Sequence, residues 1–393
     1  MPDQRASATE HRIPVVLVTG FLGSGKTTLM NRLLKAPAFA RAGVVVNEYG
    51  TVSIDHLLVA SPKARTRIID SGCLCGHVHE EVASSLLDLH HRAQGDPAAG
   101  FDCVLIETSG LADPVPIIQI ITTDHDVSTR FELRTVVTVV DAVHGAARLA
   151  THAESLKQAA VADTLVVSKI DLAEGNAIEA LETRLSAINP AARRLRAAYG
   201  SVDAETVLGQ PGFRITERSD AARAWLADCA YHDHVAPASA DTSIRTFALE
   251  HESEITVPGL VLWLNLLAGM RGGGLLRVKG VVNVEGRPFA IQAVQTVISE
   301  PQPLDAWPDD DRRSRLVFIV RGMDADDVHR TFAVFDFDAG RAPRNAWIDP
   351  ANYRCFAATM ELFRRTTGRA MAGPALDRSS VPNAVRIAWP PRL

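Results

Sequence analysis

Nine residues at positions 20–28, GFLGSGKTT, constrain the fold of this chain more than any other segment. They satisfy the pattern G-x-x-x-x-G-K-[ST], in which a glycine-rich turn lets successive backbone N–H groups point at phosphate oxygens. The apolar run at 15–18 predicts a strand buried on both faces, and Leu29 and Leu33 predict a helix after the turn. Because strand, turn and helix occur in this order, we interpret the segment as a phosphate-binding loop rather than a glycine-rich turn without a ligand.

The residues of this loop have separate expected tasks. The helix N-terminus adds its positive dipole end to the backbone N–H groups. Lys26 is expected to reach the outer phosphates, and the Thr27 hydroxyl to supply one ligand of a Mg²⁺ ion. The residues expected to contact the nucleotide in this loop are Gly20, Gly23, Ser24, Gly25, Lys26, Thr27 and Thr28.

Composition excludes several classes of protein. The chain has 393 residues, 47% of them hydrophobic, with a net charge of −5 and no long run of Lys and Arg, so neither nucleic acid nor an acidic membrane is an expected partner. The N-terminal MPDQRASATEH lacks the apolar core of a signal peptide, and the longest apolar stretch, 257–270, is too short to span a bilayer. We therefore expect a cytoplasmic protein with reduced thiols at its five cysteines. Its oligomeric state is not predicted.

Strand and helix patterns alternate along the first half of the chain. Apolar runs at 44–46, 104–106, 136–140 and 165–167 predict further strands, with helical segments between them. This alternation predicts an α/β fold, a mostly parallel sheet wound by helices as in P-loop NTPases. Since ligands bind outside the carboxyl ends of such strands, the polar motifs that follow the strands are expected to converge on one crevice.

A change of pattern after residue 225 predicts a second, smaller α+β domain. There a polar stretch rich in small residues precedes an expected strand at 243–249, a buried helix at 258–270, paired strands and a helix at 325–334 capped by Asp324. One helix is also expected at 351–365. The predicted parts are a disordered N-terminus (1–12), a P-loop GTPase domain (13–225), a linker (226–242), the α+β domain (243–340) and a C-terminal extension (341–393).

The sequence Ser168-Lys169-Ile170-Asp171 after the fourth of these runs resembles the element by which GTPases recognise guanine. Asp171 can accept hydrogen bonds from guanine N1–H and the exocyclic amine, whereas adenine would leave this carboxylate unsatisfied. The stem of Lys169 can lie across the base. A K-x-D on an exposed loop is the alternative, but its place after a phosphate loop and a strand favours GTP over ATP. Ser168 replaces the usual asparagine, so we expect a brace on the phosphate loop to be lost.

Glu107 ends the strand that we expect beside the loop strand, where a carboxylate can hold Mg²⁺ directly or through water. Gly110 can donate its N–H to the γ-phosphate, a contact that exists only before hydrolysis. An ordinary surface glutamate is the alternative for Glu107. No glutamine follows Gly110 to orient the attacking water, so Glu48 is the remaining candidate and slow GTP hydrolysis is expected.

Six segments together, GFLGSGKTT, VVNEYG, SGCLCG, IETSGLADP, VVSKIDL and GGGLLRVKGVV, closely resemble the CobW-like family of P-loop GTPases, over about residues 13 to 335. The resemblance implies a GTP-dependent protein that binds a transition metal at a C-x-C-C motif. It also implies that the metal is delivered to a client metalloprotein, or inserted into it.

This chain departs from that motif, because Cys73-Leu74-Cys75 is followed by Gly76. Two thiolates are an incomplete site for Zn²⁺, or for Co²⁺ or Fe²⁺, but His77 and His79 can complete a Cys₂His or Cys₂His₂ set. In the alternative, both histidines lie on an exposed first helical turn and bind no metal. A second H-x-H pair, His232 and His234, is interpreted as part of an ordinary solvated loop.

The expected function is therefore that of a GTP-hydrolysing metallochaperone. A nucleotide-dependent switch that binds a partner without a metal of its own is the alternative that Gly76 leaves open. A metabolic kinase is disfavoured by the guanine motif.

Overall fold

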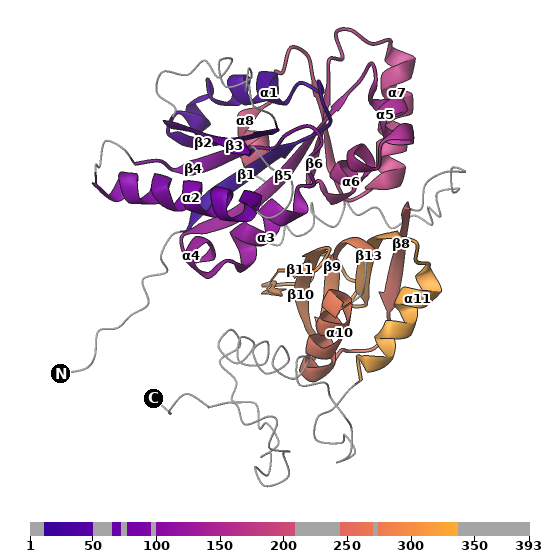
Figure 1. Ribbon diagram of the computed structural model, residues 1–393. Coiled ribbons are helices and arrows are strands. Elements are labelled where there is room, and N and C mark those ends of the chain that lie inside the picture. Colours follow the sequence, from indigo (N-terminus) through magenta and orange to yellow (C-terminus); the bar gives the residue numbers. More distant parts are fainter. Residues whose placement is uncertain are drawn as a thin grey trace, which may run out of the picture.

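The computed structural model describes residues 12–49, 65–71, 77–95, 100–208, 244–269, 274–299 and 301–336. They form two domains, each built on one sheet, which lie one above the other in Figure 1.

The first domain is built on a parallel sheet, as predicted. Seven strands are described, in the order β3-β2-β4-β1-β5-β6-β7, and every neighbouring pair is parallel. They are β1 (Ile13–Thr19), β2 (Ala42–Tyr49), β3 (Arg65–Ser71), β4 (Cys103–Glu107), β5 (Phe131–Asp141), β6 (Thr164–Ser168) and β7 (Arg193–Ala197). The strand of Glu107 does pair with the loop strand, because Val18 of β1 is in register with Glu107.

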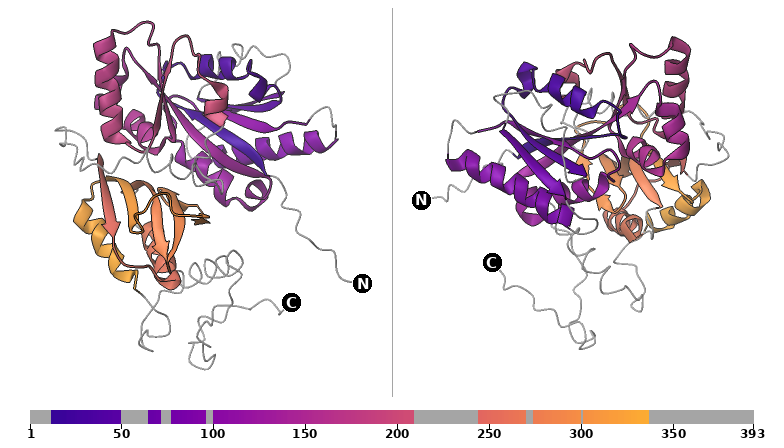
Figure 2. Two further views of the ribbon diagram at one scale, coloured as in Figure 1. Left: turned by 180° about the vertical axis from the view of Figure 1, so that it is seen from behind. Right: turned by 45° about the horizontal axis from the view of Figure 1, so that its top comes forward.

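Helices cover both faces of this sheet (Figures 1 and 2). Val15 and Leu17 belong to the apolar core on one face, and Val16 and Val18 to the core on the other, so β1 is buried on both sides as its sequence predicts. The first core includes residues of α2 (His77–Gly95), α3 (Val115–Thr123) and α4 (His125–Ser128). The second includes α1 (Lys26–Leu33), η1 (Pro37–Phe39) and α8 (Ala204–Leu208). A third core around β6 includes α5 (Gly145–Thr151), α6 (Ala153–Val161) and α7 (Gly175–Ile188).

The second domain is an antiparallel sheet with helices on one face. Its strand path is β11-β10-β9-β13-β8, with β12 paired to β10. The strands are β8 (Ile244–His251), β9 (Leu275–Val284), β10 (Arg287–Val294), β11 (Val297–Ile298), β12 (Gln302–Pro303) and β13 (Ser314–Arg321). The helices are α10 (Val257–Gly269), α11 (Ala325–His329) and η5 (Arg330–Val334), and their apolar side chains pack with Trp263 and Phe318 in one core. This is the α+β architecture that the sequence predicts.

Local sequence explains several ends of elements. Asp324 caps α11 through a hydrogen bond from the Asp327 N–H, and the Asp327 carboxylate accepts one in return. The single helix expected at 325–334 is two elements, because the chain continues as the 3₁₀-helix η5. The apolar stretch that begins at Val257 forms α10, and no helix among the described residues has the length and hydropathy needed to cross a bilayer.

Residues 1–11 of the expected N-terminus, the linker at 226–242, the C-terminal extension and the helix at 351–365 fall outside the described residues. The sequence did not single out every element of the first domain, β7 and α3 among them. The edge strand β7 reads RRLRA, and α3 reads VPIIQIITT, an apolar run that gives no helical period by itself.

A buried ion pair joins the two domains. Arg277 of β9 is 2% exposed, and its guanidinium donates to the carboxylate of Asp163 and to the carbonyl of Val161, at the C-terminal end of α6. The other carboxylate oxygen of Asp163 accepts from the Val136 N–H of β5 at 2.9 Å. Apolar side chains surround this contact, with Leu276 and Ile319 packed into the core of α6 and α7. Because the pair is buried, removing either residue would leave the charge of the other without compensation and destabilise the protein.

We expect the substitution Arg277→Met to destabilise the protein by about 3 to 5 kcal/mol, because it leaves the Asp163 carboxylate buried without its cation. Adding Asp163→Asn should restore part of that loss. The matched control is Arg196→Met, since Arg196 forms an exposed pair with Glu182 and its loss should leave the unfolding midpoint unchanged. Urea unfolding of the four proteins measures this, and equal midpoints for Arg277→Met and Arg196→Met would contradict it.

Candidate nucleotide site

The motifs singled out in the sequence meet at one edge of the parallel sheet. The strands β1, β4, β5 and β6 are neighbours, and their carboxyl ends lead into the loop at 20–25, Glu107, Asp141 and the segment 168–171 respectively (Figure 1). This is the edge at which α/β sheets bind ligands.

The loop at 20–25 presents the N-terminus of α1 without a side-chain cap. Gly25 is the N-cap with φ 99°, a left-handed conformation that a residue with Cβ adopts only with strain. No side chain accepts a hydrogen bond there and no acidic residue lies in the first turn, so the first N–H groups of α1 can bind an anion. Lys26 is 8% exposed, and its ammonium donates to the carbonyls of Gly20 (2.9 Å) and Phe21 (3.3 Å), which holds the positive charge inside the loop.

The two predicted Mg²⁺ ligands lie together. The Thr27 hydroxyl donates to Glu107 Oε1 at 2.9 Å, although 80 residues separate them in the sequence. Glu107 is 4% exposed at the end of β4. A hydroxyl and a buried carboxylate beside a phosphate-binding loop are the oxygen donors that Mg²⁺ takes in such sites, so this pair fits that ion.

Gly110 packs directly against the phosphate loop. A Cβ added to Gly110 would lie 2.6 Å from the Leu22 backbone nitrogen, closer than real contacts allow. Glycine is therefore required at this position by the close approach of two backbones. The approach places the segment after β4 against the phosphate loop at Leu22.

The segment after β6 is tied to the phosphate loop by Lys169. Its Nζ donates to the Gly23 carbonyl and to Asp141 Oδ2, both at 2.7 Å, and its backbone has φ 57°. Burial raises the pKa of Asp141, but hydrogen bonds from Lys169 and from the N–H groups of Val143 and His144 outweigh burial and lower that pKa below its usual value. Arg148 adds a second cation 3.5 Å from the same carboxylate. Asp141 thus stays ionised and orients Lys169.

Ser168 corrects one expectation. Its hydroxyl donates to the Ser24 carbonyl at 2.6 Å, so the serine does brace the phosphate loop and the prediction of a lost brace was wrong. The residue is 4% exposed, at the end of β6. A hydroxyl suffices here because the loop backbone comes within direct reach of the strand end, which the sequence alone does not show.

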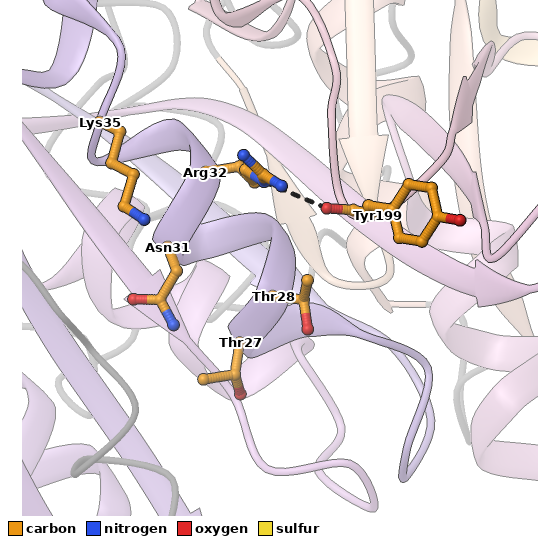
Figure 3. Close-up of a pocket in the computed structure, with 6 residues that line it drawn as sticks. All are labelled: Thr27, Thr28, Asn31, Arg32, Lys35 and Tyr199. Carbon is orange, nitrogen blue, oxygen red and sulfur yellow. Dashed lines mark hydrogen bonds between the residues drawn. The ribbon is translucent and has the colours of Figure 1, made fainter.

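Asp171 is exposed and lies beside a turn that sequence analysis did not identify. Its Oδ1 accepts from the Tyr199 N–H at 3.3 Å, and the Tyr199 carbonyl accepts from Arg32 Nε at 3.2 Å (Figure 3). This turn follows β7 and forms one side of a cavity of about 450 Å³ along α1. The side chains that line it are those of Thr27, Thr28, Asn31, Arg32, Lys35 and Tyr199. The sequence signal that could have identified this turn is Gly200, which follows Tyr199 after the edge strand, because glycine is typical of turns.

The predicted transition-metal ligands are not placed. Cys73 and Cys75 lie outside the described residues, and so do the side chains of Glu48 and of His77, with which α2 begins. Within the described ranges, no group of three His, Cys, Asp or Glu side chains can hold a metal ion. Cys103 of β4 is buried, and burial together with the nearby Asp102 raises its thiol pKa to about 12, so this thiol is protonated.

Comparisons with known proteins agree with this geometry. Residues 14–196 match the family model "CobW/HypB/UreG, nucleotide-binding domain", and residues 244–335 match "Cobalamin synthesis protein cobW C-terminal domain". The chain is 30% identical to the zinc chaperone YjiA of Escherichia coli over 323 residues, which cover 82% of this chain and 98% of that one. The chain belongs to the CobW/HypB/UreG family. The zinc chaperone CobW of Pseudomonas aeruginosa is 28% identical over 80% of this chain and 88% of its own. The crystal structure of Zn(II)-bound YjiA GTPase from E. coli superposes with a TM-score of 0.60 at 25% identity, over 83% of this chain and 99% of that one.

The CobW resemblance seen in the motifs is thus confirmed, and so is the predicted pairing of a P-loop domain with a C-terminal α+β domain.

We expect the substitution Ser168→Ala to loosen the phosphate loop of the nucleotide-free protein. Losing one hydrogen bond of about 1 kcal/mol should speed amide hydrogen exchange at residues 22–26 roughly fivefold. The control is Ser84→Ala, which removes an exposed hydroxyl that bonds only to its own helix at the Glu81 carbonyl. Exchange at the loop that is the same in both variants would show that the Ser168 brace contributes nothing.

Proposed function

We propose that this protein is a GTP-dependent zinc chaperone that passes the metal to a client metalloprotein. The observation that carries the proposal is the contact of Ser168 and Lys169 with the phosphate loop, because it joins a triphosphate cradle to a guanine-recognition motif in one site. The zinc chaperones named above, which match this chain across both domains, support the choice of cargo.

In the proposed site, α1 and its loop hold the phosphates. The backbone N–H groups of Gly23, Ser24, Gly25 and the first turn surround the β-phosphate, with Gly20 allowing the turn and Thr28 next to the α-phosphate. Lys26 leaves the loop carbonyls and binds the outer phosphates. Thr27 and Glu107 hold Mg²⁺, which neutralises charge on the phosphate oxygens when it is bound.

Guanine is recognised by Asp171, with the stem of Lys169 against the base. Asp171 accepts from the Tyr199 N–H, so its carboxylate stays oriented toward the turn after β7. Guanine N1–H and the exocyclic amine then replace bulk water as its donors.

Hydrolysis is proposed to be slow. The Gly110 N–H is proposed to bind the γ-phosphate, so that the segment beginning at Gly110 responds to the presence of this phosphate. Since no glutamine follows Gly110 in the sequence, Glu48 at the end of β2 is the candidate for orienting the water. Loss of the γ-phosphate would release the Gly110 segment, and this release is the proposed trigger for dissociation of the client.

Zinc, the cargo, is proposed to bind Cys73 and Cys75 with His77 as a third ligand. These residues lie between the end of β3 at Ser71 and the first turn of α2. The GTPase unit is proposed to extend over 13–225 and the C-terminal domain over 243–340, with the linker 226–242 between them.

Changing Asp171→Asn is expected to exchange base preference. Asparagine cannot accept both guanine donors, but its amide can donate to the extra carbonyl of xanthine. We expect the affinity for GTP to fall by about 100-fold or more and that for XTP to rise, in calorimetric titration with Mg²⁺ present. The exposed Asp126→Asn is the matched control. No binding of GTP by the unmodified protein would overturn the proposed function itself.

Zinc binding is expected to depend on the paired cysteines and on nucleotide. Metal analysis and titration with Zn²⁺, Co²⁺ or Fe²⁺, with and without a GTP analogue, should show one high-affinity ion that is lost in Cys73→Ser with Cys75→Ser. Cys103→Ser is the control, because its buried thiol should contribute nothing. The same stoichiometry in the double variant would contradict the assignment of these ligands.

A further inference from the structure

A glutamine from another helix contacts the Gly110 segment. Gln158 of α6 is 1% exposed, and its Nε2 donates to the carbonyls of Ala112 (3.0 Å) and Gly110 (3.3 Å). No glutamine directly follows Gly110 in the sequence, whereas the fold supplies one from 48 residues further along the chain. Buried behind the segment, this side chain contacts backbone rather than solvent.

The contact fixes the direction of the peptide groups in the segment. The peptide planes that Gln158 holds are Gly110–Leu111 and Ala112–Asp113, so the N–H groups of Leu111 and Asp113 keep their orientation, and the Gly110 N–H lies in the adjoining peptide. Lys157, the preceding residue of α6, forms an ion pair with Asp113, and the Asp113 carboxylate accepts from the Val115 N–H at the start of α3. Two consecutive residues of α6 therefore hold the whole stretch from Gly110 to the beginning of α3.

The C-terminal end of the same helix, one turn beyond Gln158, is held by the C-terminal domain. Arg277 donates to the Val161 carbonyl and to Asp163, and α6 packs against β9. At this end of the helix, the side-chain amide of Asn189 lies 2.9 to 3.0 Å from the carbonyl oxygens of Ala159, Ala160 and Ala162 and donates to them. On the other side of the segment, α3 packs against β11 of the same domain. Both helices that flank the Gly110 segment thus contact the C-terminal domain (Figure 1).

We propose that Gln158 is a positioning residue for the Gly110 segment, and that α6 couples this segment to the C-terminal domain through Asp163 and Arg277. The inference rests on the proposed function, since it assumes that the segment responds to the γ-phosphate. Without Gln158 the segment must be ordered by the γ-phosphate alone, so binding of GTP weakens while binding of GDP does not. By linkage, the coupling acts in both directions, and changes at Arg277 alter the preference for GTP.

The first test compares nucleotide affinities of Gln158→Met with the unmodified full-length protein. Methionine keeps the length of the side chain but donates no hydrogen bond. We expect affinity for a non-hydrolysable GTP analogue to fall about tenfold, as the loss of two hydrogen bonds implies, with GDP affinity changed less than twofold. The matched control is Gln119→Met on the exposed face of α3, which should change neither.

The second test measures coupling by hydrogen exchange at saturating nucleotide. In the unmodified protein, exchange at residues 275–279 of β9 should differ between the analogue and GDP, and Gln158→Met should abolish the difference. The pair Asp163→Asn with Arg277→Met should abolish it as well, and its effect on the GTP-to-GDP affinity ratio should be less than additive with Gln158→Met.

The possible outcomes distinguish failure of this inference from failure of the proposed function. If Gln158→Met weakens both nucleotides equally, its role is only structural and the inference fails. Unchanged affinities in a folded variant also overturn it, while the proposed function stands. If Gln158→Met does not fold, the half-exposed pair Lys157→Ala with Asp113→Asn tests the same link, and an unchanged GTP-to-GDP ratio there is contrary to the inference. Failure of the unmodified protein to bind GTP refutes the proposed function instead.

Discussion

Two backbone carbonyls of the phosphate loop, those of Gly23 and Ser24, accept hydrogen bonds from the segment after β6, and the nucleotide site depends on this contact. A glycine-rich turn is costly to order, because glycine loses more backbone freedom than other residues. Here the turn is held from outside by Ser168 and Lys169, and Lys169 is in turn oriented by a buried, ionised Asp141. The loop is therefore preorganised by residues of the proposed guanine motif, so in the proposed site phosphate and base recognition would support one another.

The two sheets are connected by a buried ion pair rather than by apolar packing alone. Replacing such a pair by apolar residues often stabilises a protein, so stability is a weak reason for its presence. Arg277 also restricts how the two domains are oriented. Its guanidinium can donate to both Val161 and Asp163 in only one orientation of β9 relative to α6. An interface of this kind can transmit a shift of α6, which a purely apolar surface would absorb by sliding.

The sequence predicted most of the sheet and the convergence of the polar motifs at one edge of it, because these follow from local patterns. Apolar runs ending in polar motifs placed the site at the carboxyl edge, and Thr27 and Glu107 do meet there at 2.9 Å. What it did not reveal depends on tertiary distance. The brace by Ser168 requires the loop and strand end to be in contact, the Tyr199 turn follows an edge strand with little apolar signal, and Gln158 approaches Gly110 from a separate helix. Periodicity carries no information on such contacts.

The order of strands also explains how a zinc site and a nucleotide site can influence each other. The proposed ligands Cys73 and Cys75 follow β3, and β2 lies between β3 and β4, the strand that ends in Glu107. Tyr49 is in register with Ser71, and Val46 with Glu107, so β2 links the ends of both motifs through one continuous set of backbone hydrogen bonds. Glu48, the candidate for orienting the hydrolytic water, belongs to this same strand. Zinc bound at the proposed ligands Cys73 and Cys75 would therefore act on β3 and, through its pairing with β2, on the strand that carries Glu48, which would give the metal a physical route to the rate of hydrolysis.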